Sequence, residues 1–134
     1  MEQNSMNEGH IKTVLICGDE ARVRQALKAL LFTREISWED DLSPIIKVVG
    51  EARHCSEAVR LVESLQPEVV IMGDSIPGSD GLEAARTIKR KWPHVKIVTL
   101  TMFPDIRQAA LEAGVDTFLL KGCLAETLFE AILS

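Results

Sequence analysis

Four polar residues follow or end apolar runs of the chain. Their side chains could act together chemically if the fold brings them close to one another. The four residues are Asp19, Asp74, Thr101 and Lys121. A hydroxyl and an ammonium suit a small anion such as phosphate, whereas clustered carboxylates suit a divalent cation such as Mg²⁺. Which chemistry is available depends on the elements that bring these residues together.

Short runs rich in β-branched residues alternate with longer segments of helical period, which is typical of a parallel sheet wrapped by helices. The expected strands are Thr13–Cys17, Ile46–Gly50, Glu68–Met72, Lys96–Thr101 and Thr117–Leu120. Their Val, Ile and Leu content indicates that both sheet faces are covered. The pattern predicts a flavodoxin-like, doubly wound, three-layer αβα fold with strand order 2-1-3-4-5. Ligands of such sheets bind at the carboxyl ends of the strands, where the four polar residues would lie.

Five helices are expected between and after these strands. The third is expected to begin at Asp80 and to end before Pro93, and the fourth to run from Pro104 to Gly114. The first carries an apolar stripe at the spacing that docks on a sheet, formed by Val23, Ala26, Leu27, Leu30 and Leu31.

Size and composition favour one domain. The chain has 134 residues, of which 46% are hydrophobic, and a polar tail over residues 1–10 precedes a single domain over residues 11–134. The net charge of −5, without a basic stripe, argues against direct nucleic-acid binding by this domain. The apolar runs are too short to span a bilayer and the N-terminus does not resemble a signal peptide, so a cytoplasmic protein is expected.

Three cysteines at wide spacing predict neither a disulfide framework nor a zinc site. The long stretch Thr33–Pro44 joins a helix to a strand at the edge opposite the polar residues, so a solvated loop is expected there. A partner contact through Trp38 is the weaker alternative.

The segment Val69–Gly78 reads as a buried strand followed by a tight loop. It resembles the phosphoacceptor turn of bacterial response-regulator receiver domains of two-component systems, the CheY-like family, and the resemblance covers Ile11–Leu133. In that family an Asp stands four residues before the Pro of this turn. Here the residue at that position before Pro77 is Gly73, so the resemblance implies an atypical receiver, or pseudo-receiver, without its phosphoacceptor.

Other marks of the family are present. The resemblance implies that Thr101 would bond a phosphoryl oxygen, that Lys121 would pair with the acceptor and its phosphoryl, and that Phe118 is the aromatic whose rotamer reports the active state. Three further stretches are similar to receivers that carry a helix-turn-helix DNA-binding output domain, namely Leu100-Thr101-Met102, Ala113-Gly114-Val115 and Gly81-Leu82-Glu83-Ala84.

The departures fall on the metal ligands. Receivers present two adjacent acids after the first strand, and here that pair reads Gly18-Asp19. Because Mg²⁺ is held by few carboxylates in a strict octahedron, the loss of two of three should remove most of the affinity. Asp19 remains as a degenerate ligand, Mg²⁺ binding is expected to be weak or absent, and no other cofactor is expected.

Two alternatives concern the remaining polar groups. Asp74 could act as a substitute acceptor only if a bulge at Gly73 turned it toward Thr101 and Lys121, because successive strand residues face opposite sides. A loop-capping or solvated Asp74 is favoured. Lys121 could pair with Asp19, or could hold a small anion together with Thr101 and amides near Gly73.

The favoured function is a degenerate receiver that works as a signalling and protein-interaction module, without aspartyl phosphorylation and without enzymatic activity. The alternatives are a phosphorelay receiver that uses Asp74 and a domain that senses a small ligand or anion. By resemblance, a protein partner or a second copy would bind the face of the fourth helix, fifth strand and fifth helix, near Phe103, Arg107, Phe118 and Lys121. A histidine kinase or an output domain after Ser134 are further expected partners.

Overall fold

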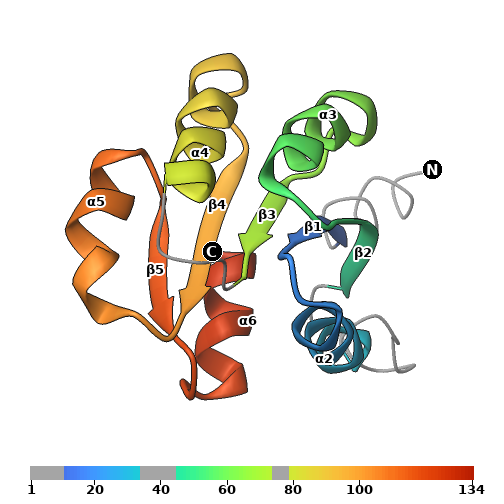
Figure 1. Ribbon diagram of the computed structural model, residues 1–134. Coiled ribbons are helices and arrows are strands. Elements are labelled where there is room, and N and C mark those ends of the chain that lie inside the picture. Colours follow the sequence, from blue (N-terminus) through green and yellow to red (C-terminus); the bar gives the residue numbers. More distant parts are fainter. Residues whose placement is uncertain (1–10, 34–44, 74–78) are drawn as a thin grey trace.

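The computed structural model describes residues 11–33, 45–73 and 79–134 and contains one five-stranded sheet (Figure 1). All pairs are parallel and the order is β2-β1-β3-β4-β5, which confirms the predicted doubly wound fold. The strands are β1 (Ile11–Cys17), β2 (Ile45–Ala52), β3 (Val69–Met72), β4 (Lys96–Thr101) and β5 (Thr117–Leu120).

Helices cover both faces of this sheet (Figure 1). One face is covered by α2 (Ala21–Phe32) and α6 (Ala125–Leu133), and the other by α3 (Cys55–Leu65), α4 (Ser79–Lys91) and α5 (Arg107–Glu112). Each face has its own buried cluster, because neighbouring residues of a strand point to opposite sides. Val14, Ile16 and Ile71 belong to the α2 and α6 side, whereas Leu15, Cys17 and Val70 belong to the other.

Several boundaries differ from the predicted ones. The strands β1 and β2 are longer, since Ile11 already pairs with Ile45 and the pairing continues to Ala52. The helix α4 begins at Ser79, one residue before the expected start. The segment expected to form one helix from Pro104 begins as the 3-10 turn η1 (Pro104–Ile106), as is frequent at helix N-termini, and continues as α5.

The apolar stripe of α2 is only partly buried. Leu27 and Leu31 are buried against the sheet, Val23 and Leu30 are half-buried, and Ala26 is exposed. The expectation that all five dock on the sheet was therefore wrong for Ala26. The physical reason is that α2 and α6 leave a cavity between them, which these partly exposed side chains line.

Within the part of the chain that the structure describes, none of the helices has the length and apolar content needed to cross a bilayer.

Candidate functional site

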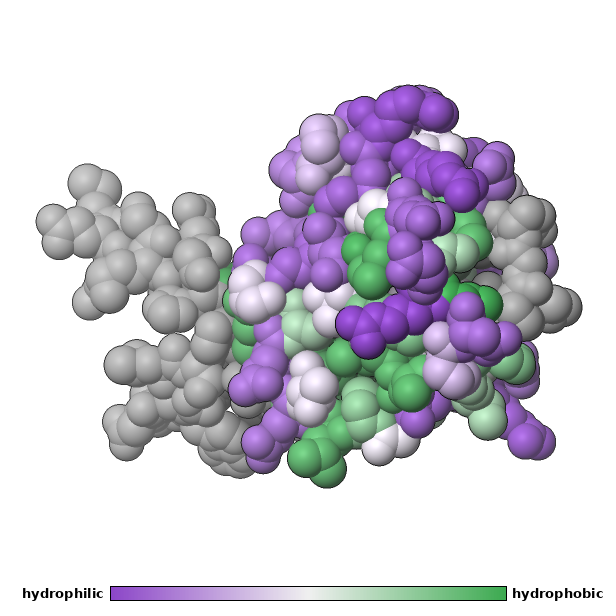
Figure 2. Space-filling view, turned by 90° about the vertical axis from the view of Figure 1, so that its left-hand side faces the viewer, coloured by the Kyte–Doolittle hydropathy of each residue, from purple (hydrophilic) through white to green (hydrophobic). Residues whose placement is uncertain are grey.

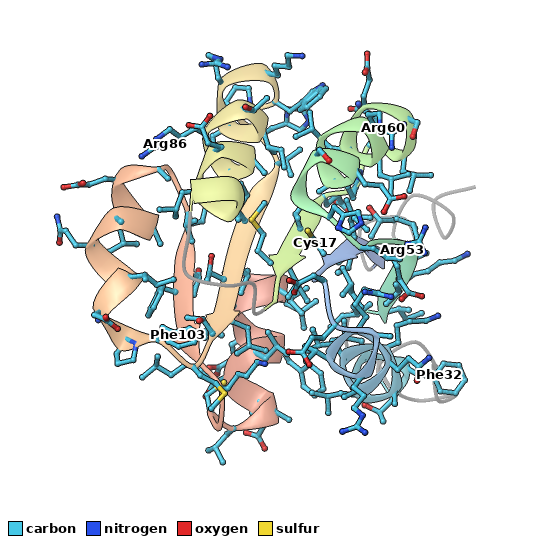
Figure 3. The ribbon with its side chains drawn as sticks, in the orientation of Figure 1. Cys17, Phe32, Arg53, Arg60, Arg86 and Phe103 are labelled. Atoms are coloured by element: carbon cyan, nitrogen blue, oxygen red, sulfur yellow. The ribbon has the colours of Figure 1, made fainter. Side chains whose placement is uncertain are left out.

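The carboxyl ends of β1 and β3 bring Gly18 and Gly73 together. Cys17 of β1 pairs with Met72 of β3, and the Gly73 N–H donates a hydrogen bond of 2.7 Å to the Cys17 carbonyl. Figure 3 labels Cys17 at this end of the sheet. A Cβ atom added to Gly18 would lie 3.9 Å from the Gly73 Cα atom. The two positions at which the family carries acids are thus neighbours in space, as the sequence predicted.

Neither glycine is required by its backbone or by close packing. The conformation of both lies outside the left-handed region that favours glycine. A Cβ on Gly73 would meet the Cys17 carbonyl oxygen at 3.4 Å and Val23 Cγ1 at 3.5 Å, and one on Gly18 would meet Arg24 Cγ at 3.8 Å. These are ordinary van der Waals distances, so a Cβ atom fits at either position.

A buried arginine lies beside Gly18. The Arg24 side chain is 9% exposed, its Nη1 donates to the Gly18 carbonyl at 2.6 Å, and its Nε donates to Glu51 Oε1 at 3.2 Å. Lys28 donates to the other oxygen of Glu51 at 2.7 Å. The hydrogen bond from Lys28 first, and that from Arg24 second, hold the pKa of Glu51 below its ordinary value against the opposing effect of burial.

The sequence interpretation missed this network. Two signals were available in the sequence. Arg24 is a cation that directly follows Val23 of the apolar helix stripe, and Glu51 is an acid near the end of an apolar strand. Neither signal identifies the partner, because the contact joins α2 to β2 across the sheet edge. The consequence for the site is that the carboxyl end of β1 is held by a cation that is already paired.

Thr101 and Lys121 lie at the adjoining ends of β4 and β5. The Lys121 N–H donates to the Thr101 carbonyl at 2.8 Å, and Lys121 is half-buried. The Thr101 side chain is 2% exposed, and its Oγ1 accepts a hydrogen bond of 3.2 Å from the Phe103 N–H. The structure therefore makes the backbones of Thr101 and Lys121 neighbours at this edge of the sheet.

Of the other candidate residues, Asp19 follows β1, whereas Phe118, Phe103 and Arg107 belong to β5 or to the segment after β4. Asp19 is exposed directly after Gly18. Phe118 is half-buried against the cluster on the α3, α4 and α5 side, while Phe103 is 37% exposed at the end of β4 and Arg107 is exposed at the start of α5. Figure 3 shows Phe103 at the foot of β4, between α5 and α6.

Asp74, the Ser75 carbonyl and the stretch Thr33–Pro44 lie outside the described residues, as does the tail 1–10. The predictions that concern them stay predictions.

The resemblance implies a magnesium ion held by three carboxylates. At the positions it implies, the described residues are Gly18, Asp19 and Gly73, so one carboxylate is present among them. No group of three or more His, Cys, Asp or Glu side chains within residues 11–33, 45–73 and 79–134 could hold a metal ion. Since Mg²⁺ relies on carboxylates in a near-ideal octahedron, no step is derived through this ion.

The fold is a doubly wound parallel sheet in which Thr101 ends β4 and Lys121 directly follows β5, at the edge where ligands of such sheets bind. A family model described as the response regulator receiver domain matches residues 14–133. The chain therefore belongs to the response regulator receiver domain family of two-component systems.

Relatives among characterised proteins carry regulator names. The chain is 37% identical over 121 residues to the transcriptional regulatory protein LiaR of Bacillus subtilis, which covers 89% of this chain and 53% of LiaR. It is 32% identical to the transcriptional regulatory protein LnrK of the same organism over 90% of this chain and 52% of LnrK. The chain spans about half the length of these relatives.

Solved structures agree with this assignment. A two-component response regulator of the LuxR family from Aurantimonas sp. SI85-9A1 matches with a TM-score of 0.75 and 29% identity, over 92% of this chain and 85% of that one. The response regulator domain of Thermotoga maritima CheB matches with a TM-score of 0.75 and 28% identity, over 91% of this chain and 93% of that one.

Proposed function

We propose that this receiver domain is a protein-interaction module whose state is not set by phosphorylation of an aspartate at the end of β3. The observation that carries the proposal is Gly73 at the acceptor position, beside Gly18 and the Cys17 carbonyl. A glycine has no side chain to form an acyl phosphate. The room around both glycines supports the proposal, because acids could stand there without displacing the backbone.

The energetic requirement favours a macromolecular partner as the input. A receiver is a two-state element, and a ligand shifts it only by binding one state more tightly. To move such an equilibrium almost completely takes a difference in binding free energy of about 5.5 kcal/mol. Burial of an apolar protein surface can supply this amount, whereas a weak ion at Asp19 cannot.

The proposed partner surface is the face formed by α5, β5 and the start of α6, hereafter the β5 face. Figure 2 looks at this side of the molecule and shows hydrophobic residues gathered over its lower half. The large apolar side chains exposed on or beside it are Met102, Phe103, Leu111, Leu120 and Leu124. Apolar surface of this kind, rimmed by charged groups such as Arg107, suits association with a protein or a second copy of the chain.

In a longer regulator the partners would include a histidine kinase and a DNA-binding output domain. The support is indirect: the relatives LiaR and LnrK are named transcriptional regulators, and one matched structure, 26% identical, is RcsB from Salmonella enterica bound to the promoter rprA. No enzymatic step and no cofactor form part of this proposal.

The direct test is incubation of the native chain with Mg²⁺ and acetyl phosphate, followed by intact-mass measurement. We expect no phosphoryl adduct. An adduct that disappears in Asp74→Asn would overturn the proposal in favour of a phosphorelay receiver that uses Asp74. A receiver domain that carries the acceptor aspartate, treated in parallel, provides the positive control for the phosphodonor.

A further inference from the structure

A cavity of about 430 Å³ lies between α2 and α6 and adjoins the β5 face at Leu124 and Ala125. Its walls are mostly aliphatic: α2 supplies Val23, Ala26, Leu27 and Leu30, α6 supplies Ala125 and Leu128, and Leu100 of β4 and Leu124 complete the apolar lining. Its volume falls within the range of pockets that hold small molecules, about 300–1,000 Å³. The apolar walls select a ligand with an apolar body.

The polar part of the lining is cationic. Arg22 of α2 and Lys121 after β5 are the charged residues among those that line the cavity. Arg22 is exposed and makes no ion pair with any other described residue. An apolar cavity with two cations in its lining is complementary to a molecule with an aliphatic body and one acidic group.

The cavity also touches the receiver site. Val23 and Leu27 line it, and their side chains lie 3.5 and 3.9 Å from the place where a Gly73 Cβ would be. Lys121 belongs to both the cavity and the carboxyl edge, where its N–H bonds the Thr101 carbonyl. A molecule in the cavity would thus contact the residues that surround the vacant acceptor position.

We propose that the cavity between α2 and α6 binds a small amphipathic anion, with an aliphatic chain among Val23, Leu27 and Leu128 and a carboxylate near Arg22 and Lys121. This site goes beyond the proposed function and does not depend on it, because an anion could bind whether or not Asp74 accepts a phosphoryl group. The outcome of the phosphorylation experiment therefore does not decide the outcome of the ligand-binding experiment.

Cys123 provides a reporter inside the site. It lines the cavity, is half-buried and is a free thiol, whereas the other described thiol, Cys17, is 2% exposed. The rate of Cys123 alkylation by iodoacetamide can be followed by mass spectrometry of its own peptide. The probe is sodium decanoate, used at concentrations where it is monomeric. Decanol and decyltrimethylammonium are the neutral and cationic controls with the same decyl chain.

Decanoate is expected to slow Cys123 alkylation in a saturable manner and to raise the midpoint of thermal unfolding. Decanol should protect less and decyltrimethylammonium least. Arg22→Gln should weaken decanoate binding roughly two- to fivefold, as for loss of one exposed charge pair, and should leave decanol binding unchanged. A Lys121→Gln variant should act in the same direction.

A matched pair of helix variants tests the location. Ala26→Phe fills the cavity from α2, and Ala29→Phe places the same side chain one turn further along α2, at an exposed residue that does not line the cavity. Only Ala26→Phe should abolish protection by decanoate. Far-UV circular dichroism of both variants establishes that α2 remains folded.

Three results would overturn the proposal. The first is equal protection by decanoate, decanol and the cationic probe, since the cations would then have no role. The second is unchanged protection in Ala26→Phe. The third is protection of Cys123 that rises with protein concentration in the absence of any probe, because a second copy of the chain would then cover the cavity.

Discussion

Gly73 and Gly18 are neighbours at the carboxyl edge, and each position has room for a Cβ atom. The neighbouring atoms stand 3.4 Å or more from the Cβ positions, and both backbone conformations are ones that other residues adopt. At the residue scale the two glycines are thus separate from Thr101 and Lys121, whose backbones are bonded to each other where β4 and β5 end. This separation makes the chemistry testable by substitution.

The variant Gly73→Asp is expected to gain weak phosphorylation by acetyl phosphate in the presence of Mg²⁺. Gly18→Asp added to it should increase the yield, because the second acid supplies another ligand for the ion. Intact-mass measurement before and after EDTA treatment checks both. If the double variant folds but never takes up a phosphoryl group, the carboxyl edge is not arranged for this reaction.

The pair of Arg24 and Glu51 gives a prediction on stability. Glu51→Gln keeps an oxygen that can accept from Arg24 but removes the negative charge that pairs with the buried guanidinium and with Lys28, so the free energy of unfolding should fall by about 1–2 kcal/mol. Arg22→Gln, at an exposed residue of the same helix, should change it by less than about 0.5 kcal/mol. Urea unfolding at pH 7 measures both.

The sign of the pH dependence follows from the lowered pKa of Glu51. A carboxyl whose pKa is lower in the folded than in the unfolded state stabilises the fold above its unfolded pKa, and this contribution is lost as the pH falls through the folded pKa. The difference in unfolding free energy between the native chain and Glu51→Gln should therefore shrink on acidification. A difference that grows below pH 4.5, the ordinary value of the group, would contradict the assigned ion pair.

At the scale of elements, the turn after α5 has a specific requirement. Gly114 has φ +102°, and a Cβ there would lie 3.0 Å from Lys89 Cγ. Lys89 cannot move aside freely, because its ammonium bonds the carbonyls of Pro93 and Val95 and the carboxylate of Asp116. Backbone strain and steric overlap therefore act together at this turn.

We expect Gly114→Ala to lower the free energy of unfolding by about 2 kcal/mol or more, from left-handed strain plus the displaced lysine. Gly122→Ala is the matched control, since Gly122 has φ +98° but no atom within 4 Å of its Cβ position. Gly122→Ala should lower the free energy of unfolding by about 1 kcal/mol, from backbone strain alone. Urea unfolding compares the two, and equal losses would show that Lys89 adjusts without cost.

The sequence predicted the elements well where a local pattern decides them. The β-branched runs located all five strands, and the strand ends correctly put Thr101 beside Lys121. Local pattern could not reveal the pairing of Arg24 with Glu51, because it depends on how α2 lies against β2. Nor could it show that Ala26 borders a cavity, since helical spacing gives the direction of a side chain but not the distance to the next helix.

At the scale of the whole molecule, the β5 face carries a group of the large apolar side chains that are exposed among the described residues. The β5 face carries Phe103, Leu111 and Leu120, each more than a third exposed. Figure 2 shows this hydrophobic area below a strongly hydrophilic one. The cavity proposed to bind an anion between α2 and α6 adjoins this face at Leu124, so a partner that covers Leu124 would also affect access to the cavity.

If the β5 face associates with a second copy, Leu120→Glu should weaken dimerisation at least about tenfold, because a charge would be buried in an apolar contact. Leu65→Glu is the control: Leu65, at the end of α3, is 40% exposed, compared with 41% for Leu120. Sedimentation equilibrium over a range of protein concentrations measures the effect. A chain that stays monomeric throughout would leave only a different protein as the partner of this face.

Gly73, directly after β3, also bears on how long a signal can last in this domain. An aspartate at this position would store the signal as a covalent bond, which persists after the donor has left and decays at the rate of its hydrolysis. Gly73 can form no such bond. Under the proposed function, the response would follow the free concentration of the molecule that binds and would last as long as that molecule stays bound.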